Sequence, residues 1–274
     1  MSGVAVSKAV ASPVEVTPGD GPVVIGLPHA GTAVPPGILA RLNARGRALA
    51  DTDWHVDRLH EGLLPGATAV RATFHRYVID ANRPPDGASL YPGRNTTGLV
   101  PLTDFDGAPI WDEPPDAAEI EARRAAFHAP YHAALAAALE RARAAHGVAI
   151  LYDAHSIRSR VPFLFEGVLP DLNIGTADGA ACAPALEAEV VRLCAEAEGF
   201  THVLNGCFKG GWTTRAYGRP AEGLHAIQME IAQSAYLESE EPPFAFDPAK
   251  AARLRPVLGR VLGRLARAAS EVRA

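Results

Sequence analysis

Side chains that commonly bind metals occur at the ends of three apolar stretches of the sequence. His29 directly follows one apolar run, His155 follows another, and Glu230 lies within a third. In α/β sheets, ligands bind at the carboxyl ends of the strands. Zinc prefers nitrogen and carboxylate ligands, and a catalytic site uses three of them and leaves one position for water. The pattern therefore predicts a metal site built from His29, His155 and a carboxylate.

The segment at 51–57 offers several candidates for the third metal ligand. Asp51, Asp53, His55 and Asp57 are close neighbours at the predicted start of a helix. Spacing does not choose between them, so the choice stays open at this point. A histidine at a strand end can equally be a hydrogen-bonded core residue, which is the alternative to a metal role.

Three arginines are candidates for binding an anionic substrate. Arg76 and Arg83 are seven residues apart, so a single strand would point them to opposite faces, and at least one is expected in a loop. Arg215 ends a loop that starts with two glycines and includes Thr214. Glycine permits close approach of a ligand to the backbone, and the planar guanidinium matches a carboxylate. Solvated surface arginines are the alternative.

Strand patterns alternate with helical patterns along the chain. Buried strands are predicted from apolar runs or alternation at 23–27, 68–79, 148–152, 163–169 and 224–231. Helices are predicted at 38–44, 51–64, 116–146 with an interruption at Pro130, 180–198 and 248–272. This alternation is typical of a layered α/β fold with a parallel or mixed sheet. We expect a single domain over 1–274.

One long stretch, 83–115, lacks a regular pattern and is rich in Pro, Gly, Asp and Thr. Structureless loops of this length are uncommon inside a compact domain and are usually functional. We interpret the stretch as a lid-like loop over a site, not as a linker between domains.

Composition limits the class of protein and its partners. The 274 residues include 26 Lys and Arg against 31 Asp and Glu, which gives a formal charge of −5 and argues against nucleic acid as a main partner. No stretch is long and apolar enough for a membrane span. The N-terminus lacks the features of a signal peptide, so we expect a cytoplasmic protein. Three cysteines, none in a CxxC pair, are expected to be small buried residues.

An ordered set of motifs resembles the bacterial N-formylglutamate amidohydrolase (deformylase) family of histidine breakdown. The motifs, in chain order, are PHAG (28–31), DTDWHVDRL (51–59), RYVIDANRP (76–84), SLYPG with NTTGL (89–99), FDG (105–107), PYH (130–132), DAHS (153–156), GGWTTRAYG (210–218) and HAIQMEI (225–231). The resemblance covers about residues 22 to 240. It implies a zinc carboxypeptidase-like fold, with three layers around a central mixed sheet.

The resemblance also implies roles for individual residues. His29, Asp53 and His155 would hold one divalent metal ion, most simply Zn²⁺, and Glu230 would activate water. The pair Asn82–Arg83 is similar to the pair that binds a substrate carboxylate in that superfamily. A further list of candidates for the second carboxylate or the oxyanion comprises Arg76, Arg215 and the adjacent Thr214. Asp153 is a candidate to orient the ligand histidines.

The implied reaction is hydrolysis of N-formyl-L-glutamate, a small dicarboxylate, to formate and L-glutamate. The alternatives are a related zinc amidohydrolase that acts on another N-acyl amino acid, a carboxypeptidase-like activity, and an inactive protein that binds dicarboxylates. Cobalt, manganese or iron are alternatives to zinc, since two histidines and a carboxylate accept each of them. The sequence makes no prediction of the oligomeric state.

Overall fold

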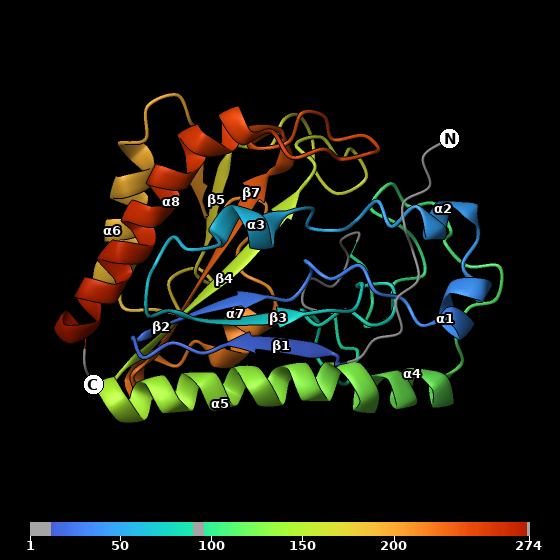
Figure 1. Ribbon diagram of the computed structural model, residues 1–274, viewed down its shortest axis with the longest axis horizontal. Helices are drawn as coiled ribbons and strands as arrows, with labels where there is room; N and C mark the ends of the chain where they lie inside the picture. The colour runs from blue at the N-terminus through green and yellow to red at the C-terminus, as the bar shows by residue number, and fades with distance from the viewer. Residues whose placement is uncertain (1–11, 90–95, 273–274) are drawn as a thin grey trace.

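A mixed β-sheet brings the predicted metal ligands toward one edge of the molecule. The structure is a computed structural model that describes residues 12–89 and 96–272. Over these residues the sheet has seven strands in the order β1-β3-β2-β4-β7-β5-β6 (Figure 1). The strands are β1 (Val14–Thr17), β2 (Val23–Leu27), β3 (Thr68–Ala72), β4 (Ala149–Ile157), β5 (Leu172–Gly175), β6 (His202–Leu204) and β7 (Leu224–Ala232). Strands β3, β2, β4 and β7 run parallel, whereas β1 and β5 are antiparallel to their neighbours β3 and β7.

Helices cover both faces of this sheet, which confirms the expected α/β fold. The α-helices are α1 (Pro36–Arg41), α2 (Ala44–Arg47), α3 (Val56–His60), α4 (Ala117–Arg123), α5 (Ala129–His146), α6 (Pro184–Ala195), α7 (Trp212–Tyr217) and α8 (Pro248–Ala268). Single π or 3₁₀ turns are at Arg124–His128, Pro220–Glu222, Gln233–Ala235 and Ala269–Glu271. Helix α5 lies along one face, and α6 and α8 lie on the other (Figure 1). In the described part of the chain, no helix has the length and apolar character of a membrane span.

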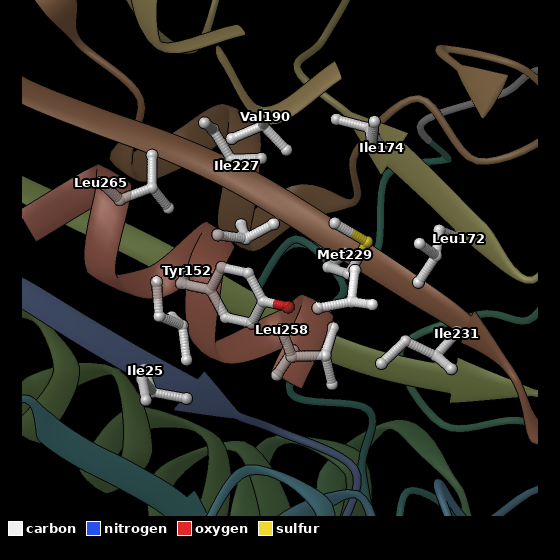
Figure 2. Close-up of a cluster of buried hydrophobic side chains, with 14 of the residues drawn as sticks. Ile25, Tyr152, Leu172, Ile174, Val190, Ile227, Met229, Ile231, Leu258 and Leu265 are labelled. Carbon is white, nitrogen blue, oxygen red and sulfur yellow. The ribbon is translucent and has the colours of Figure 1, made fainter. Parts of the chain in front are cut away.

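The face toward α6 and α8 is a continuous hydrophobic core. Tyr152 of β4 and Ile227 and Met229 of β7 point toward Leu258 and Val190 of the two helices (Figure 2). Side chains alternate between the faces of a strand, so this core takes alternate residues from the middle of β4 and β7. Both strands are buried along their whole length, as expected for parallel strands covered on both faces.

The opposite face of β4 and β7 changes character along the strands. Near their amino ends its residues are apolar, and Leu151, for example, belongs to the hydrophobic cluster that includes α5. Near their carboxyl ends the same face carries Asp153 and His155 on β4 and Gln228 and Glu230 on β7. The strand register sets Asp153 opposite Gln228 and His155 opposite Glu230. Four polar side chains therefore lie side by side where an α/β sheet usually binds its ligands.

The predicted helix at 116–146 is helical throughout, with one irregular turn. Asp116 caps α4 by accepting a 2.8 Å hydrogen bond from the Glu119 amide. A π turn at Arg124–His128 separates α4 from α5, and Pro130 lies in the first turn of α5. Proline has no N–H to donate to the preceding turn, and the helix continues through Pro130 after the π turn.

The helix predicted at 51–64 is mostly wrong. Only Val56–His60 is helical, because His55 adopts a left-handed backbone conformation with φ 58°. The chain before it is a loop, which is held by a 3.1 Å hydrogen bond from the Asp53 amide to the His29 carbonyl. The acidic residues at 51 and 53 are therefore not in the first turn of a helix.

The strand predicted at 163–169 is also wrong. Its residues form turns, in which the Val161 carbonyl accepts from the amides of Leu164 and Phe165. Phe163 and Val168 are exposed, and the nearest strand, β5, begins at Leu172. A short apolar run does not by itself distinguish a strand from a loop that packs on the surface.

Strand β4 is longer than the predicted 148–152 and runs to Ile157, whereas several other elements are shorter than expected or were not predicted. The strand expected at 68–79 ends at Ala72, and α6 begins at Pro184. The helix expected at 38–44 divides into α1 and α2. Strands β1, β5 and β6, of three or four residues each, were not predicted. Cys182 and Cys194 are buried as expected, but Cys207 is exposed.

The segment at 83–115 is irregular over its described residues, as predicted. It contains isolated bridges, such as the one between Thr103 and Pro109, but no helix and no strand among those residues. Residues 90–95, and with them most of the SLYPG motif, lie outside the described residues. Its function as a lid stays a prediction.

Candidate active site

Three predicted metal ligands meet at the carboxyl end of the sheet. His29 lies in the turn after β2, Asp53 lies in the loop before α3, and His155 lies on β4. Each offers a ligand atom, and the three atoms lie within 4.8 Å of one another. All three side chains are buried. The fold therefore joins residues that are up to 126 positions apart into one group that could hold a metal ion.

The fold of the segment at 51–57 selects Asp53 from the four candidates. Its Oδ2 lies 3.2 Å from Nδ1 of His155, and its Oδ1 accepts a 3.0 Å hydrogen bond from Arg76. Asp51 instead accepts from the Tyr77 hydroxyl, at 2.7 Å. His55 contacts the Phe244 carbonyl, at 3.1 Å. Asp57 lies 3.7 Å from Arg71, away from the two ligand histidines.

A carboxylate lies beside each of the two histidines predicted to bind the metal. Nε2 of His29 is 2.7 Å from Oδ1 of Asp80, and Nε2 of His155 is 3.2 Å from Oδ1 of Asp153. In both rings Nδ1 is then the atom that faces Asp53. Nδ1 of His29 is buried without a hydrogen-bond partner among the described residues. In a metal-binding histidine one ring nitrogen binds the ion and the other usually contacts a carboxylate or another acceptor, so these residues fit a divalent ion.

The protonation of the three ligands reflects burial and nearby charges. Burial, together with the positive charge of Arg76, lowers the pKa of His29 to about 4. Burial acts in the same direction on His155, but Asp153 and Asp53 outweigh it and raise its pKa well above the usual value. Burial favours protonation of Asp53, but Arg76 and the histidines lower its pKa. His29 and Asp53 are thus in the forms that bind metals.

Glu230 is next to this group on the neighbouring strand. Burial raises the pKa of its carboxyl group to about 7. Its Oε2 accepts a 3.1 Å hydrogen bond from Nε2 of Gln228. A carboxylate with such a pKa can both accept and release a proton near neutral pH, which is the property of a general base.

Glu230, His29 and His155 open onto a cavity of about 300 Å³. Among the described residues, its positively charged lining consists of Arg76, Arg83 and Lys209. The Arg76 guanidinium lies 4.9 Å from the centre of the Phe105 ring, which also lines the cavity. An anionic ligand would be attracted to such a lining, in a chain whose net charge is negative.

Asn82 and Arg83 both line the cavity. The Asn82 side chain accepts a 2.9 Å hydrogen bond from the Thr213 amide, and its Nδ2 lies 3.2 Å from Nε2 of His155. Arg83 donates to the carbonyl and the hydroxyl of Thr97, at 2.8 Å each. The structure thus places this pair beside the ligand group, with Arg83 tied to the irregular segment.

Thr214 and Arg215 lie in α7, and the loop expected there is a short helix after Gly211. Thr214 is fully buried and donates a 3.1 Å hydrogen bond to Oδ2 of Asp153. Arg215 donates to the Gly210 carbonyl, at 3.0 Å. Neither is among the cavity-lining residues in the described part of the chain. Thr214 is therefore connected to the site by its hydrogen bond to Asp153.

Sequence reasoning missed three residues at the site. Asp80 orients His29, Gln228 contacts Glu230, and Lys209 lines the cavity. Asp80 and Gln228 lie inside motifs that the sequence analysis quoted, and Lys209 directly precedes another. Gln228 is two positions from Glu230 on a predicted strand, so the period of two could have shown that they share a face.

Comparisons with known proteins show which family this chain resembles. The model of the N-formylglutamate amidohydrolase family matches residues 21–237. The chain is 48% identical to an N-formylglutamate deformylase of Pseudomonas aeruginosa over 244 residues, 88% of this chain and 91% of that protein. It is 47% identical to an N-formylglutamate deformylase of Pseudomonas putida over 224 residues, 81% of this chain and 84% of the relative.

Solved structures also resemble this fold. An N-formylglutamate amidohydrolase from Ralstonia eutropha superposes with a TM-score of 0.81 at 30% identity, and the match covers 95% of this chain and 99% of that one. A gene product from Agrobacterium tumefaciens superposes with a TM-score of 0.69 at 22% identity, covering 95% and 98% of the two chains. The second similarity concerns the fold.

Proposed function

Because this chain belongs to the N-formylglutamate amidohydrolase family, we propose that it hydrolyses N-formyl-L-glutamate to formate and L-glutamate. The observation that carries the proposal is the position of Glu230 beside the His29–Asp53–His155 group, in a cavity lined by cationic side chains. The substrate has two carboxylates, which the cations would bind. The reaction breaks the C–N bond of the formamide and joins the oxygen of water to the formyl carbon.

The proposal includes one divalent metal ion, with zinc as the first candidate. The ion would be held by Nδ1 of His29, Oδ2 of Asp53 and Nδ1 of His155. This is supported by Nδ1 of His29, which is buried and has no hydrogen-bond partner among the described residues. When bound there, the ion would polarise a carbonyl oxygen and lower the pKa of water.

The chain's own residues would move protons and charge. Glu230 would accept a proton from the attacking water and deliver it to the leaving nitrogen, which suits a carboxyl group with a pKa of about 7. Arg76 would donate hydrogen bonds to the oxygen on which negative charge develops, since its guanidinium lines the cavity. Its contact with Asp53 keeps it close to the ligand group.

Substrate carboxylates would be bound by side chains around the cavity. Arg83 and Asn82 are proposed for one of them, since both line the cavity next to His155. Of the two candidates for the second, Arg76 lines the cavity and Arg215 does not, so Arg76 is proposed, with Thr214 acting through Asp153. Lys209 adds a further cation to the lining.

The test is formate release by purified protein from N-formyl-L-glutamate, N-formyl-L-glutamine and N-acetyl-L-glutamate. We expect the highest kcat/KM for N-formyl-L-glutamate. The neutral side-chain amide of N-formyl-L-glutamine loses one ionic contact, and the acetyl group of N-acetyl-L-glutamate is larger than a formyl group. Faster cleavage of another N-acyl amino acid, or of a peptide's carboxyl end, would replace the proposed substrate. Binding of dicarboxylates without any hydrolysis would identify an inactive binding protein.

The place of the reaction is also part of the proposal. We infer from the family that the enzyme serves histidine degradation, and a cytoplasmic location stays the prediction made above. The first point is tested by deleting this chain's gene in the source organism. The deletion should impair growth on histidine and cause N-formylglutamate to accumulate.

A further inference from the structure

Gln228 is a buried amide whose position the proposed reaction has not yet used. It lies on the same face of β7 as Glu230, opposite Asp153 of β4, and it lines the cavity. Only 3% of its surface is exposed. A buried amide needs partners for both of its polar atoms, so its contacts define its orientation.

The backbone after Gly210 fixes which way the Gln228 amide points. The Gly211 amide donates a 2.7 Å hydrogen bond to Oε1 of Gln228. Oε1 accepts and Nε2 donates, so Nε2 must be the atom directed at Glu230. Nε2 lies 3.1 Å from Oε2 of Glu230.

Asn82 is fixed in the same way by the same segment. The Thr213 amide donates to Oδ1 of Asn82, which leaves Nδ2 directed at His155. A Cβ atom at Gly211 would overlap the Asn82 side chain, so the segment can approach Asn82 this closely only with glycine at position 211. Residues 211–213 therefore set the orientation of two amides, one beside a metal-ligand histidine and one beside Glu230.

We propose that Gln228 is a positioning residue that holds the Glu230 carboxylate through Oε2 and leaves Oε1 as the oxygen that exchanges protons with water and the leaving nitrogen. An Oε2 that accepts a hydrogen bond from an amide has no room for a proton on that side. The single donor thus restricts both the rotation of the carboxylate and the choice of oxygen. This inference rests on the proposed role of Glu230 as general base.

The first test compares the wild type with Gln228→Met, which has a similar size but lacks both polar atoms. We expect kcat to fall by about 10–100-fold, part of the 10²–10⁴-fold effect of a general base. KM should stay within about two-fold and the bound metal should match the wild type, since no ligand is removed. An unchanged kcat, or a loss that appears in KM or in metal content, would overturn the proposal.

Gln228→Glu provides a rescue that a purely structural role would not show. This side chain keeps an oxygen for the Gly211 amide and carries a donor to Glu230 only while protonated. Two carboxyl groups this close share one proton. Activity relative to the wild type should therefore fall as pH rises and that proton leaves, whereas Gln228→Met should lose activity at every pH. The same relative activity of Gln228→Glu at all pH values would contradict the proposal.

A structural readout separates this inference from the proposed function. Crystal structures of the wild type and Gln228→Met should show the Glu230 carboxylate in one orientation in the former and rotated in the latter. If the wild type releases no formate, the proposed function fails, and this comparison still decides the positioning role. An identical Glu230 carboxylate in both structures would overturn it.

Discussion

At the scale of single residues, the site depends on which atom of each side chain is free. Asp80 contacts Nε2 of His29, and Asp153 contacts Nε2 of His155. Nδ1 of both rings therefore faces Asp53. Arg76 donates a hydrogen bond to Oδ1 of Asp53, the oxygen that does not face the histidines. The ring or carboxylate atom of each of the three proposed ligands that does not face the common point therefore contacts another side chain. The orientation of the proposed ligands therefore comes from residues that do not themselves bind the metal.

Asp80→Asn tests that orientation. The asparagine oxygen can still accept from His29, but the negative charge that makes the imidazole a better ligand is lost. We expect metal affinity to fall by about 10–100-fold, measured by competition with a chromophoric chelator. Asp171→Asn, at a half-buried aspartate that accepts a hydrogen bond from Thr201, is the matched control and should bind metal as the wild type does. Equal affinities for both variants would remove Asp80 from this role.

Glu230→Gln tests the general base. The amide has nearly the same shape as the carboxyl group but cannot accept the proton from water, so kcat should fall by about 10²–10⁴-fold. Metal content, measured by elemental analysis, should not change, because Glu230 is not among the proposed ligands. Glu196→Gln, at an exposed residue paired with Arg192, is the control. Turnover at the wild-type rate in Glu230→Gln would assign the base role to another residue.

At the scale of elements, the pleat of β4 and β7 does most of the positioning. One face of each strand is mainly apolar, and the other changes from apolar to polar at Asp153 and Gln228. This change is visible in the sequence, because the strands at 148–152 and 224–231 were predicted from buried runs and the polar residues follow with a period of two. Two of the three metal-ligand candidates, and Glu230, could therefore be predicted from strand ends.

The remaining parts of the site depend on contacts between distant segments. Asp53 could not be selected from its neighbours, because the left-handed conformation of His55 replaces the expected helix by a loop. Asp80 reaches His29 across 51 positions of sequence, and no local pattern reports such a pair. The prediction of a strand at 163–169 is wrong because this apolar run forms turns at the surface, which its apolar residues alone do not show.

Gly211→Ala tests the segment that orients the two amides. The added Cβ would overlap Asn82, and the backbone at 211–213 would have to move. We expect a loss of kcat of at least about 10-fold, since small displacements of catalytic groups are costly, and a lower Tm. Gly37→Ala in α1, where a Cβ meets nothing within 4 Å, is the control and should keep both values. Wild-type kinetics in Gly211→Ala would show that the close approach to Asn82 has no functional consequence.

At the scale of the whole molecule, buried neutral histidines make the fold sensitive to acid. Burial lowers the pKa of His60 to about 4, and its ring is held by the Val56 carbonyl at 2.8 Å. The unfolded chain binds a proton near pH 6.5, and the folded chain does not bind it until about pH 4. The contribution of His60 is therefore complete above pH 6.5 and is lost as pH falls from there toward 4.

The free energy of unfolding should accordingly decrease by up to about 1.4 kcal/mol per pH unit for this histidine between these two pKa values. His60→Gln should reduce the slope by that amount, measured by urea unfolding at several pH values. Burial lowers the pKa of His132 to about 3, so this histidine changes the free energy of unfolding with pH in the same direction. A slope that is the same in His60→Gln and the wild type would contradict this account.

The central claim, that His29, Asp53 and His155 hold a metal ion needed for hydrolysis, is tested most directly by chelation. Metal content and formate release from N-formyl-L-glutamate are measured before chelation, after it, and after zinc is restored, in the wild type and in His155→Ala. The account predicts about one ion per wild-type chain, activity that disappears and returns with it, and a His155→Ala protein that retains no metal. Full formate release by wild-type protein from which the metal has been removed would contradict it.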